Sequence, residues 1–360
     1  MICIPNKSRR PVSLEVAGKN GIYNVPPILK GKEMFNAETT LRYTKEEKLA
    51  FLQMSLEEKI QRTKELILEW YLQFDGKVYV AFSGGKDSTV LLHIARSIKR
   101  CKDIKGVFSD TGLEYPEIRD FVKKQENIVW IKPKLTFKQV VEKYGWPVIS
   151  KEQSSYVYEY RNTKSEKLRN IRLNGKDLKD GRYSKSFKIS EKWKPILESD
   201  FKISDFCCDV MKKKPFSDFE RQTGMKRIVG VMAEESALRL EMFLKGNCNE
   251  FNKAHPVSKP LSFWTEQDIY EYIKRNDLEI ASVYGDIVKD ENGKWKTTGA
   301  HRTGCMFCMY GLHLESHPNR FERMKETHPK QYEYIMDKLN GRHVMETYLA
   351  CDKKKGTEDK

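Results

Sequence analysis

One short segment of the sequence combines the residue types that bind phosphate groups. It consists of Ser83, Gly84, Gly85, Lys86, Asp87 and Ser88. The glycines let the backbone approach phosphate oxygens, the serines add hydroxyl donors, and the lysine supplies a mobile cation. The aspartate fits such a loop if it holds a divalent metal ion or caps a helix. The segment therefore predicts an anion-binding loop.

Four cysteines form a second candidate site. They are Cys207, Cys208, Cys305 and Cys308. Four thiolates suffice for a [4Fe–4S] cluster or for a structural zinc ion. Adjacent cysteines are awkward for a zinc knuckle, where about two to four residues separate the paired ligands. Zinc and unmetallated buried thiols stay open as alternatives, because cysteine spacing alone does not fix the metal.

The elements around the phosphate loop must position it. The apolar run at 77–82 is typical of a strand, and residues 89–96 have helical character. A helix N-terminus that follows a glycine turn presents free N–H groups and the positive end of its dipole to an anion. Further strands are predicted at 106–109, 128–131 and 227–232, and helices after Pro116 and at 136–144, 265–273 and 319–339, the last interrupted near Pro329. This alternation predicts an α/β fold with a doubly wound, mostly parallel, Rossmann-like sheet.

The sequence divides into four consecutive regions by composition and periodicity. They are an N-terminal arm and two helices at 1–74, an α/β domain at 75–260, a C-terminal helical region with the Cys-x-x-Cys pair at 261–345, and a charged tail at 346–360. Within the second region, residues from about 151 to 205 have little clear periodicity and are interpreted as a basic insertion, either an ordered lid or a flexible loop.

The excess of basic over acidic residues indicates the kind of binding partner to expect. Lys and Arg number 66 against 51 Asp and Glu, a formal charge of +15 over 360 residues, which favours nucleic acid or small anions as partners. The basic and aromatic residues of the insertion suit nucleic acid, although an ordinary solvated surface is the alternative. They are Tyr156, Tyr158, Tyr160, Arg161, Lys164, Lys167, Arg169 and Arg172.

The distribution of apolar residues indicates in which cellular compartment the protein is expected. No apolar run approaches the roughly 18 residues that span a bilayer, and the first residues lack the apolar core of a secretion signal. We therefore expect a cytoplasmic protein with no membrane partner. In a reducing compartment its cysteines are expected as metal ligands, catalytic thiols or buried apolar residues rather than disulfides.

The segment at 83–88 resembles the Ser-Gly-Gly-x-Asp-Ser signature of the ATP pyrophosphatase, or adenine nucleotide α-hydrolase, superfamily. This resemblance implies that the loop grips the pyrophosphate of ATP, bridged by Mg²⁺, while a substrate oxygen attacks the α-phosphate and becomes adenylated. Lys86 would then neutralise the departing pyrophosphate, and Asp87 would help to place the metal ion.

Two further segments are similar to those of phosphoadenosine phosphosulfate (PAPS) reductases. Residues 109–117 resemble their Asp-Thr-Gly segment, which implies nucleotide contacts from Asp110, Thr111 and Gly112 and a catalytic role for Asp110. Residues 230–239 resemble their Gly-x-x-x-x-x-Ser-x-x-Arg segment, where the arginine, here Arg239, meets the anionic end of the substrate. A turn cap at Asp110 and a solvated charge at Arg239 are the structural alternatives.

The cysteine arrangement is similar to that of [4Fe–4S] adenylyl sulfate reductases and of DNA phosphorothioation sulfurtransferases, so we favour the iron–sulfur cluster. The Glu-Cys-Gly-Leu/Ile-His motif of the reductases does not occur, and Tyr310 stands where its cysteine would lie. Lys86 is retained, as in members that cleave ATP between the α- and β-phosphates.

The main hypothesis is thus an ATP-dependent adenylating enzyme of the PAPS-reductase-like group that acts in sulfur transfer. Its expected partners are ATP, a nucleic acid substrate or small metabolite, and a protein that donates sulfur or electrons. The first alternative is a sulfonucleotide reductase with an unusual thiol such as Cys351. The second is a nucleic-acid-binding protein in which nucleotide and zinc are structural.

Overall fold

The computed structural model describes residues 14–18, 21–25, 44–177, 183–184 and 187–353. Most of the predicted N-terminal arm and the last residues of the predicted tail therefore lie outside the described residues. The chain forms two compact units. The first consists of Met1–Phe108, Asp120–Val129 and Thr223–Arg302, and the second of Ser109–Arg119, Trp130–Gln222 and Thr303–Lys360.

A six-stranded sheet supports the phosphate loop. Its strand order is β10-β11-β9-β3-β4-β5. The strands are β3 (Val78–Ala81), β4 (Lys105–Ser109), β5 (Ile128–Ile131), β9 (Lys226–Ile228), β10 (Asn249–Glu250) and β11 (Val257–Ser258). β3 pairs in parallel with β4 and β9, and β9 pairs in parallel with β11, whereas β10 is antiparallel. The chain thus extends the sheet from β3 on one side and returns to its other side, which confirms the doubly wound α/β fold.

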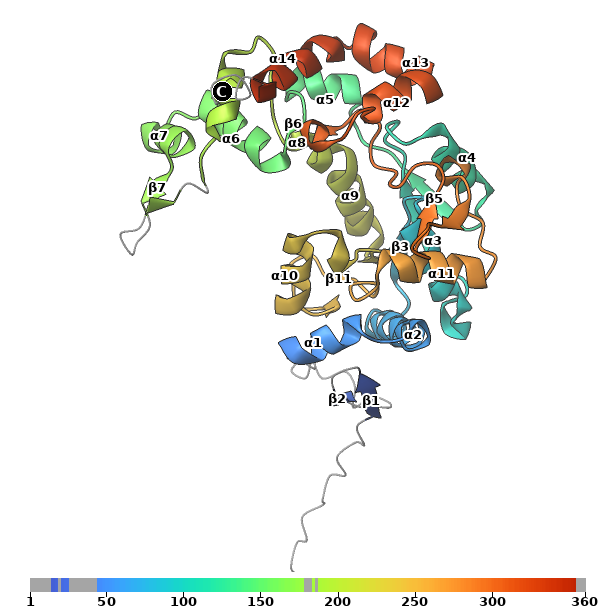
Figure 1. Cartoon of the computed structure of the whole chain (residues 1–360). Coiled ribbons are helices and arrows are strands. Elements are labelled where there is room, and N and C mark those ends of the chain that lie inside the picture. Colours follow the sequence, from blue (N-terminus) through green and yellow to red (C-terminus); the bar gives the residue numbers. More distant parts are fainter. Residues whose placement is uncertain (1–13, 19–20, 26–43, 178–182, 185–186, 354–360) are drawn as a thin grey trace, which may run out of the picture. The chain divides into compact units, whose positions relative to one another are not determined.

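The first unit contains several helices in addition to the sheet (Figure 1). They include α1 (Lys45–Leu52), α2 (Leu56–Gln73), α3 (Lys86–Ser97), α10 (Ala237–Lys245) and α11 (Glu266–Arg275). α3 contacts α2 and α11 and buries one apolar face, which includes Val90, Leu91 and Ile94. Ser55 and Thr265 cap α2 and α11, each through a reciprocal capping box. α4 (Pro116–Lys124) follows β4 in the chain.

The second unit has a largely helical core of its own. Its helices include α5 (Phe137–Lys143), α6 (Lys151–Asn162), α7 (Glu166–Asn174), α8 (Phe206–Cys208), α9 (Lys214–Thr223), α12 (Arg320–Thr327), α13 (Pro329–Glu333) and α14 (Gly341–Lys353). Short strands β6 (Val148–Ile149) and β14 (Met309–Tyr310) pair in parallel. Trp146, Trp193, Phe307, Phe321 and Tyr348 are among the buried side chains of this core.

Three short antiparallel strand pairs complete the described strands. They are β1 (Leu14–Gly18) with β2 (Gly21–Val25), β7 (Lys176–Asp177) with β8 (Tyr183–Ser184), and β12 (Ile287–Lys289) with β13 (Trp295–Thr297). Within the described ranges, no helix has both the length and the apolar character needed to cross a membrane.

Three local predictions need correction. The strand predicted at 227–232 ends at Ile228, and the backbone then passes the start of α3 at Gly230, where a Cβ would lie 3.4 Å from the Asp87 carbonyl oxygen. The region expected to lack periodicity contains helices α6 and α7, each with a serine N-cap. α7 buries no side chain, which explains why its sequence shows no apolar stripe. The predicted charged tail at 346–360 begins inside α14.

Candidate functional site

The phosphate loop connects β3 to α3 in the first unit. Gly84 has φ of +72°, a conformation that side chains with a Cβ rarely adopt, and Gly85 is the N-cap of α3. The Ser88 hydroxyl accepts a hydrogen bond from the Ser83 N–H at 3.1 Å and donates to the Gly85 carbonyl at 2.9 Å. The two outer residues of the loop therefore fix its shape, and α3 starts where an anion is expected to bind.

Lys86 is buried and already paired, so the expectation of a mobile cation is corrected. Its Nζ lies 3.0 Å from a carboxylate oxygen of Glu266 and 3.4 Å from the His301 carbonyl oxygen. The rings of Tyr270 and Tyr284 lie 5.5 and 5.8 Å from the ammonium. Burial alone would lower the pKa of Lys86, but Asp87 and Glu266 raise it above its ordinary value. Lys86 is thus a fixed positive charge at the start of α3.

Asp87 brings a carboxylate to the same end of α3. Its Oδ1 lies 3.6 Å from Lys86 Nζ and makes no hydrogen bond within the described residues. Burial raises the pKa of Asp87; Lys86 opposes that shift, whereas the carboxylates of Glu235 and Glu266 add to it. Three carboxylates therefore lie near the loop, which is an arrangement that a divalent cation would stabilise.

Sequence reasoning did not identify Glu266, although it predicted the helix that carries it. Thr265 caps the start of this helix, but nothing in the local sequence indicates that the side chain of the next residue, Glu266, reaches Lys86. Tyr284 was missed as well. Its hydroxyl accepts a hydrogen bond from the Lys86 N–H at 3.2 Å.

Arg239 also belongs to the first unit, at the N-terminal end of α10. Its guanidinium pairs with Glu235, and its side chain is 40% exposed. Ser236 is the N-cap of α10 and accepts a hydrogen bond from the Arg239 N–H. The Ser-x-x-Arg spacing therefore has a local structural role as a helix cap, and the exposed guanidinium remains accessible to an anion.

Asp110, Thr111 and Gly112 follow β4 in the second unit. Arg119 donates to Asp110 Oδ2 at 3.0 Å, while the buried Oδ1 makes no hydrogen bond within the described residues. Glu114 accepts from the Thr111 N–H and hydroxyl at 3.1 and 2.6 Å, and Gly112 has φ of +73°. Asp110 is thus oriented by an arginine, with one acceptor atom left open.

The second unit groups the four predicted metal-ligating cysteines. Cys207 and Cys208 lie in α8, and Cys305 and Cys308 lie in the turn before β14. Each of the four interacts electrostatically with the other three. Burial, followed by the neighbouring thiols, raises the pKa of Cys207, and burial raises the pKa of Cys308 to about 11.

The chemistry of this donor set fits a thiolate-bound metal centre. Burial raises the pKa of Cys305 and of Cys308, whereas Lys212 opposes that shift at Cys305 and the Tyr310 backbone opposes it at Cys308. Burial lowers the pKa of Lys212, but Cys305 and Glu114 raise it overall, so the ammonium remains available to a thiolate. In the described part of the chain, no three His, Cys, Asp or Glu side chains are already arranged at metal-binding geometry. The sulfur atoms of the four cysteines would have to move into ligand positions when a metal binds.

The other described cysteines are not among these predicted ligands. Cys101, Cys248 and Cys351 are buried, and Cys3 lies outside the described residues. Cys351 lies in α14 and donates a hydrogen bond to the Thr347 carbonyl at 3.4 Å. Because an attacking thiol must reach its substrate, this position does not suit the nucleophile that a reductase would require.

Arg161 of the predicted basic insertion is not free to bind nucleic acid. Its guanidinium donates to the carbonyl oxygens of Ile196, Leu197, Ser199 and Phe201 at 2.7 to 3.1 Å. Lys164, Lys167 and Arg169 are exposed by contrast. The insertion therefore contains both a structural arginine and solvent-facing cations.

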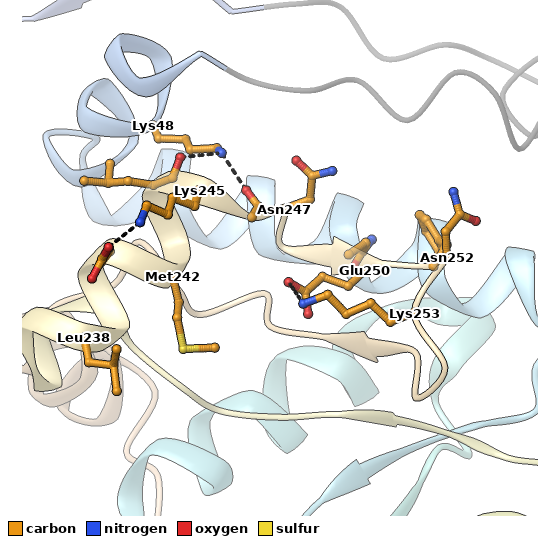
Figure 2. A pocket seen from close by; sticks show the side chains of 13 residues that line it. Lys48, Leu238, Met242, Lys245, Asn247, Glu250, Asn252 and Lys253 are labelled. Carbon is orange, nitrogen blue, oxygen red and sulfur yellow. Dashed lines mark hydrogen bonds and ion pairs between the residues drawn. The ribbon is translucent and has the colours of Figure 1, made fainter. Parts of the chain in front are cut away.

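A pocket of about 750 Å³ lies elsewhere in the first unit. Figure 2 shows that its lysines are engaged: Lys48 donates to the Leu244 and Gly246 carbonyls, Lys245 pairs with Glu241, and Lys253 pairs with Glu250. No residue of the phosphate loop lines this pocket. Its volume would accept a small molecule, but its paired lysines do not form a phosphate site.

Relatives of the chain are about a quarter identical to it over the aligned residues. An uncharacterized protein of Methanocaldococcus jannaschii is 24% identical over 297 residues, which cover 79% of this chain and 53% of the relative. The match thus spans about half the length of that relative. The adenosine 5′-phosphosulfate reductase of Staphylococcus haemolyticus is 24% identical over 224 residues, or 59% of this chain and 67% of the relative.

Solved structures and a family model complete the comparison. The phosphate complex of phosphoadenylyl-sulfate (PAPS) reductase from Candida auris has a TM-score of 0.33 and 15% identity, covering 71% of this chain and all of that one. FMN adenylyltransferase from Candida glabrata has a TM-score of 0.36 and 12% identity over 67% and 65% of the two chains. The model of the phosphoadenosine phosphosulfate reductase domain matches residues 77–171 and 147–309. Because these matches cover more than half of its sequence, the chain belongs to the phosphoadenosine phosphosulfate reductase domain family.

Proposed function

We propose that the chain binds ATP in the loop at 83–88 and transfers its adenylyl group to an acceptor in a sulfur-transfer reaction. In this proposal Cys207, Cys208, Cys305 and Cys308 bind a [4Fe–4S] cluster, with zinc as the alternative metal. Nucleic acid or a small metabolite is the acceptor, and a separate protein supplies sulfur or electrons.

The observation that carries the proposal is the buried ammonium of Lys86 at the N-terminus of α3. Lys86 Nζ is held 3.0 Å from Glu266, at the point where the loop and the helix dipole favour an anion. Sulfonucleotides have no β,γ-pyrophosphate for such a cation to neutralise, whereas ATP does. A fixed positive charge there supports cleavage between the α- and β-phosphates.

Residues of the first unit would divide the work on ATP. The N–H groups of the first turn of α3 and the positive φ of Gly84 favour a close approach of the phosphates. Lys86 would stabilise the charge that develops on pyrophosphate, and Asp87 would orient Mg²⁺, which reduces the repulsion met by an oxygen nucleophile. Arg239 would meet the anionic end of the substrate.

A metal bound by the four cysteines would provide a sulfur-rich centre in the second unit, and in this proposal sulfur transfer takes place there. The residues themselves would hold it, because thiolates are the ligands of iron–sulfur clusters and of structural zinc. Lys212 would offset the negative charge of Cys305.

A sulfonucleotide reductase is the second candidate, and the staphylococcal relatives named adenosine 5′-phosphosulfate reductases favour it. The burial of Cys351 weighs against the thiol that this candidate would need. In a sulfonucleotide reductase, Lys86 would also have no pyrophosphate leaving group to stabilise.

The test is isothermal titration with ATP, AMP, adenylyl sulfate and PAPS, followed by assays for pyrophosphate and sulfite with a reductant present. Lys86→Ala should lower pyrophosphate release by roughly 100-fold, the usual effect of removing one transition-state contact, with little change in AMP affinity. Lys77→Ala, an exposed lysine just before β3, is the matched control. Sulfite release without affinity for ATP would favour the reductase instead.

A further inference from the structure

Tyr310 is fixed beside the cysteine group by its backbone. It lies in β14, two residues after Cys308, and pairs with Ile149 of β6. The next residue, Gly311, donates from its N–H to the Ile149 carbonyl at 2.7 Å, and Arg320 donates to the Tyr310 carbonyl. The ring of Tyr310 therefore starts from a backbone held on both sides.

The hydroxyl of Tyr310 is buried and makes no hydrogen bond within the described residues. A phenol that loses water without gaining a partner costs free energy, and phenylalanine would fill the same space without that cost. A buried donor without an acceptor is uncommon in a folded interior, and it indicates an acceptor that does not belong to the protein chain.

The groups around this hydroxyl identify the class of partner. Cys207, Cys208 and Cys308 lie within electrostatic range of it, and so does the carboxylate of Asp205. A protonated thiol is a weak acceptor, but a metal-bound thiolate or an inorganic sulfide carries negative charge and accepts hydrogen bonds well. A phenol keeps its proton at neutral pH, so it can only serve such a sulfur as a donor.

We propose that the Tyr310 hydroxyl donates a hydrogen bond to a metal-bound sulfur of the Cys207, Cys208, Cys305 and Cys308 centre, an inference that rests on the cluster in the proposed function. Tyr310 then adds to two groups that act electrostatically on the same thiols, Lys212 on Cys305 and the Tyr310 backbone on Cys308. Hydrogen-bond donors to metal ligands orient those ligands and set the electronic character of the metal centre.

The hydrogen bond has a spectroscopic signature that does not depend on catalysis. A donor withdraws electron density from the sulfur, so it weakens the iron–sulfur bond and lowers its stretching frequency. Exchange of the hydroxyl proton for deuterium shifts the same band. Resonance Raman spectra of the oxidised, anaerobically purified protein in H₂O and in D₂O measure both effects without any reduction step.

Tyr310→Phe should raise the iron–sulfur stretching frequencies and remove part of the deuterium shift. Replacement of Tyr310 by 3-fluorotyrosine makes the hydroxyl a stronger donor in nearly the same volume, so it should move the bands the opposite way. Tyr156→Phe is the control, because its hydroxyl donates to Glu152 in the same unit. The fluorinated protein keeps the test decisive if the phenylalanine variant does not fold.

Opposite shifts in the two variants, with none in the control, would support the inference. Unchanged bands in an iron-loaded protein would overturn it while leaving the cluster intact, and would point to Asp205 as the acceptor. Purified wild-type protein without iron and sulfide would refute the cluster and, with it, this role for Tyr310.

Discussion

The ammonium of Lys86 lies 3.0 Å from a carboxylate oxygen of Glu266, which comes from a helix far along the chain. The same carboxylate accepts a hydrogen bond from the Tyr270 hydroxyl at 3.2 Å and lies 3.5 Å from His301 Nδ1. The charged ammonium at the phosphate loop is therefore already paired with a carboxylate before any nucleotide arrives. ATP must compete with Glu266 for it.

Glu266→Gln should strengthen ATP binding. The substitution removes a negative charge near the incoming phosphates and frees Lys86; with screening close to that of water, one unit charge at about 4 Å contributes about 1 kcal/mol, or about 5-fold in affinity. AMP affinity should change less, and the gain should shrink with added salt. Isothermal titration with both nucleotides measures this, with Glu279→Gln as the control, because Glu279 pairs only loosely with Lys124 in the same unit. Weaker ATP binding would show that Glu266 assists the nucleotide, for example through magnesium.

Cys305→Ser should lower both the metal content and the thermal stability of the protein. Loss of one thiolate removes a ligand and the folding free energy coupled to metal binding, and a midpoint decrease of about 5 °C is expected. Iron, sulfide and zinc analysis after anaerobic purification, with calorimetry, measures the effect. Cys101→Ser, a buried cysteine of the first unit, should leave the metal content unchanged. Stoichiometric zinc without labile sulfide would contradict the iron–sulfur proposal.

Arg161→Gln should destabilise the second unit rather than act on nucleic acid. The guanidinium donates to four backbone carbonyls and to the Ser199 hydroxyl, so its loss should cost about 3 kcal/mol of unfolding free energy. Chemical denaturation measures this cost. Lys164→Gln, at an exposed position of the same region, should leave the unfolding free energy nearly unchanged. Equal stability of both variants would mean that water replaces the arginine without cost.

Nucleic acid binding by the insertion should instead depend on its exposed cations. Replacing Lys164, Lys167 and Arg169 together by Gln should weaken binding and reduce its salt dependence, because fewer counterions are released from the phosphates. Binding isotherms over a range of salt concentrations give both quantities. A salt slope equal to that of the wild type would leave these residues as an ordinary solvated surface.

His93→Gln should flatten the acid limb of the stability profile. Burial, with a contribution from Lys64, lowers the pKa of His93 below its ordinary value of 6.5. Below that value the unfolded chain binds a proton that the folded chain does not, so stability present above it is lost as the pH falls. Melting temperatures between about pH 7 and about pH 5 measure the slope. His255→Gln, at an exposed position, is the control, and equal slopes in all three proteins would contradict the prediction.

Local sequence determined the elements that carry the phosphate loop. An apolar run, two glycines and a following apolar stripe predicted the strand, turn and helix that β3 and α3 form. Capping boxes at Ser55 and Thr265, each within four residues of sequence, set where α2 and α11 begin. These features depend on backbone propensities and on contacts within about four residues, which a short sequence contains in full.

Tertiary packing decided which of these residues meet. Glu266 reaches Lys86, and Arg161 reaches a carbonyl-lined turn, because distant segments pack together, and no local pattern in either segment encodes its partner. α6 and α7 also escaped prediction, since α7 buries no side chain and so leaves no apolar period in the sequence. The sequence by itself determined the local elements and the chemical types available, whereas long-range packing selected the neighbours that hold Lys86 in place and leave the Tyr310 hydroxyl without a protein partner in the described chain.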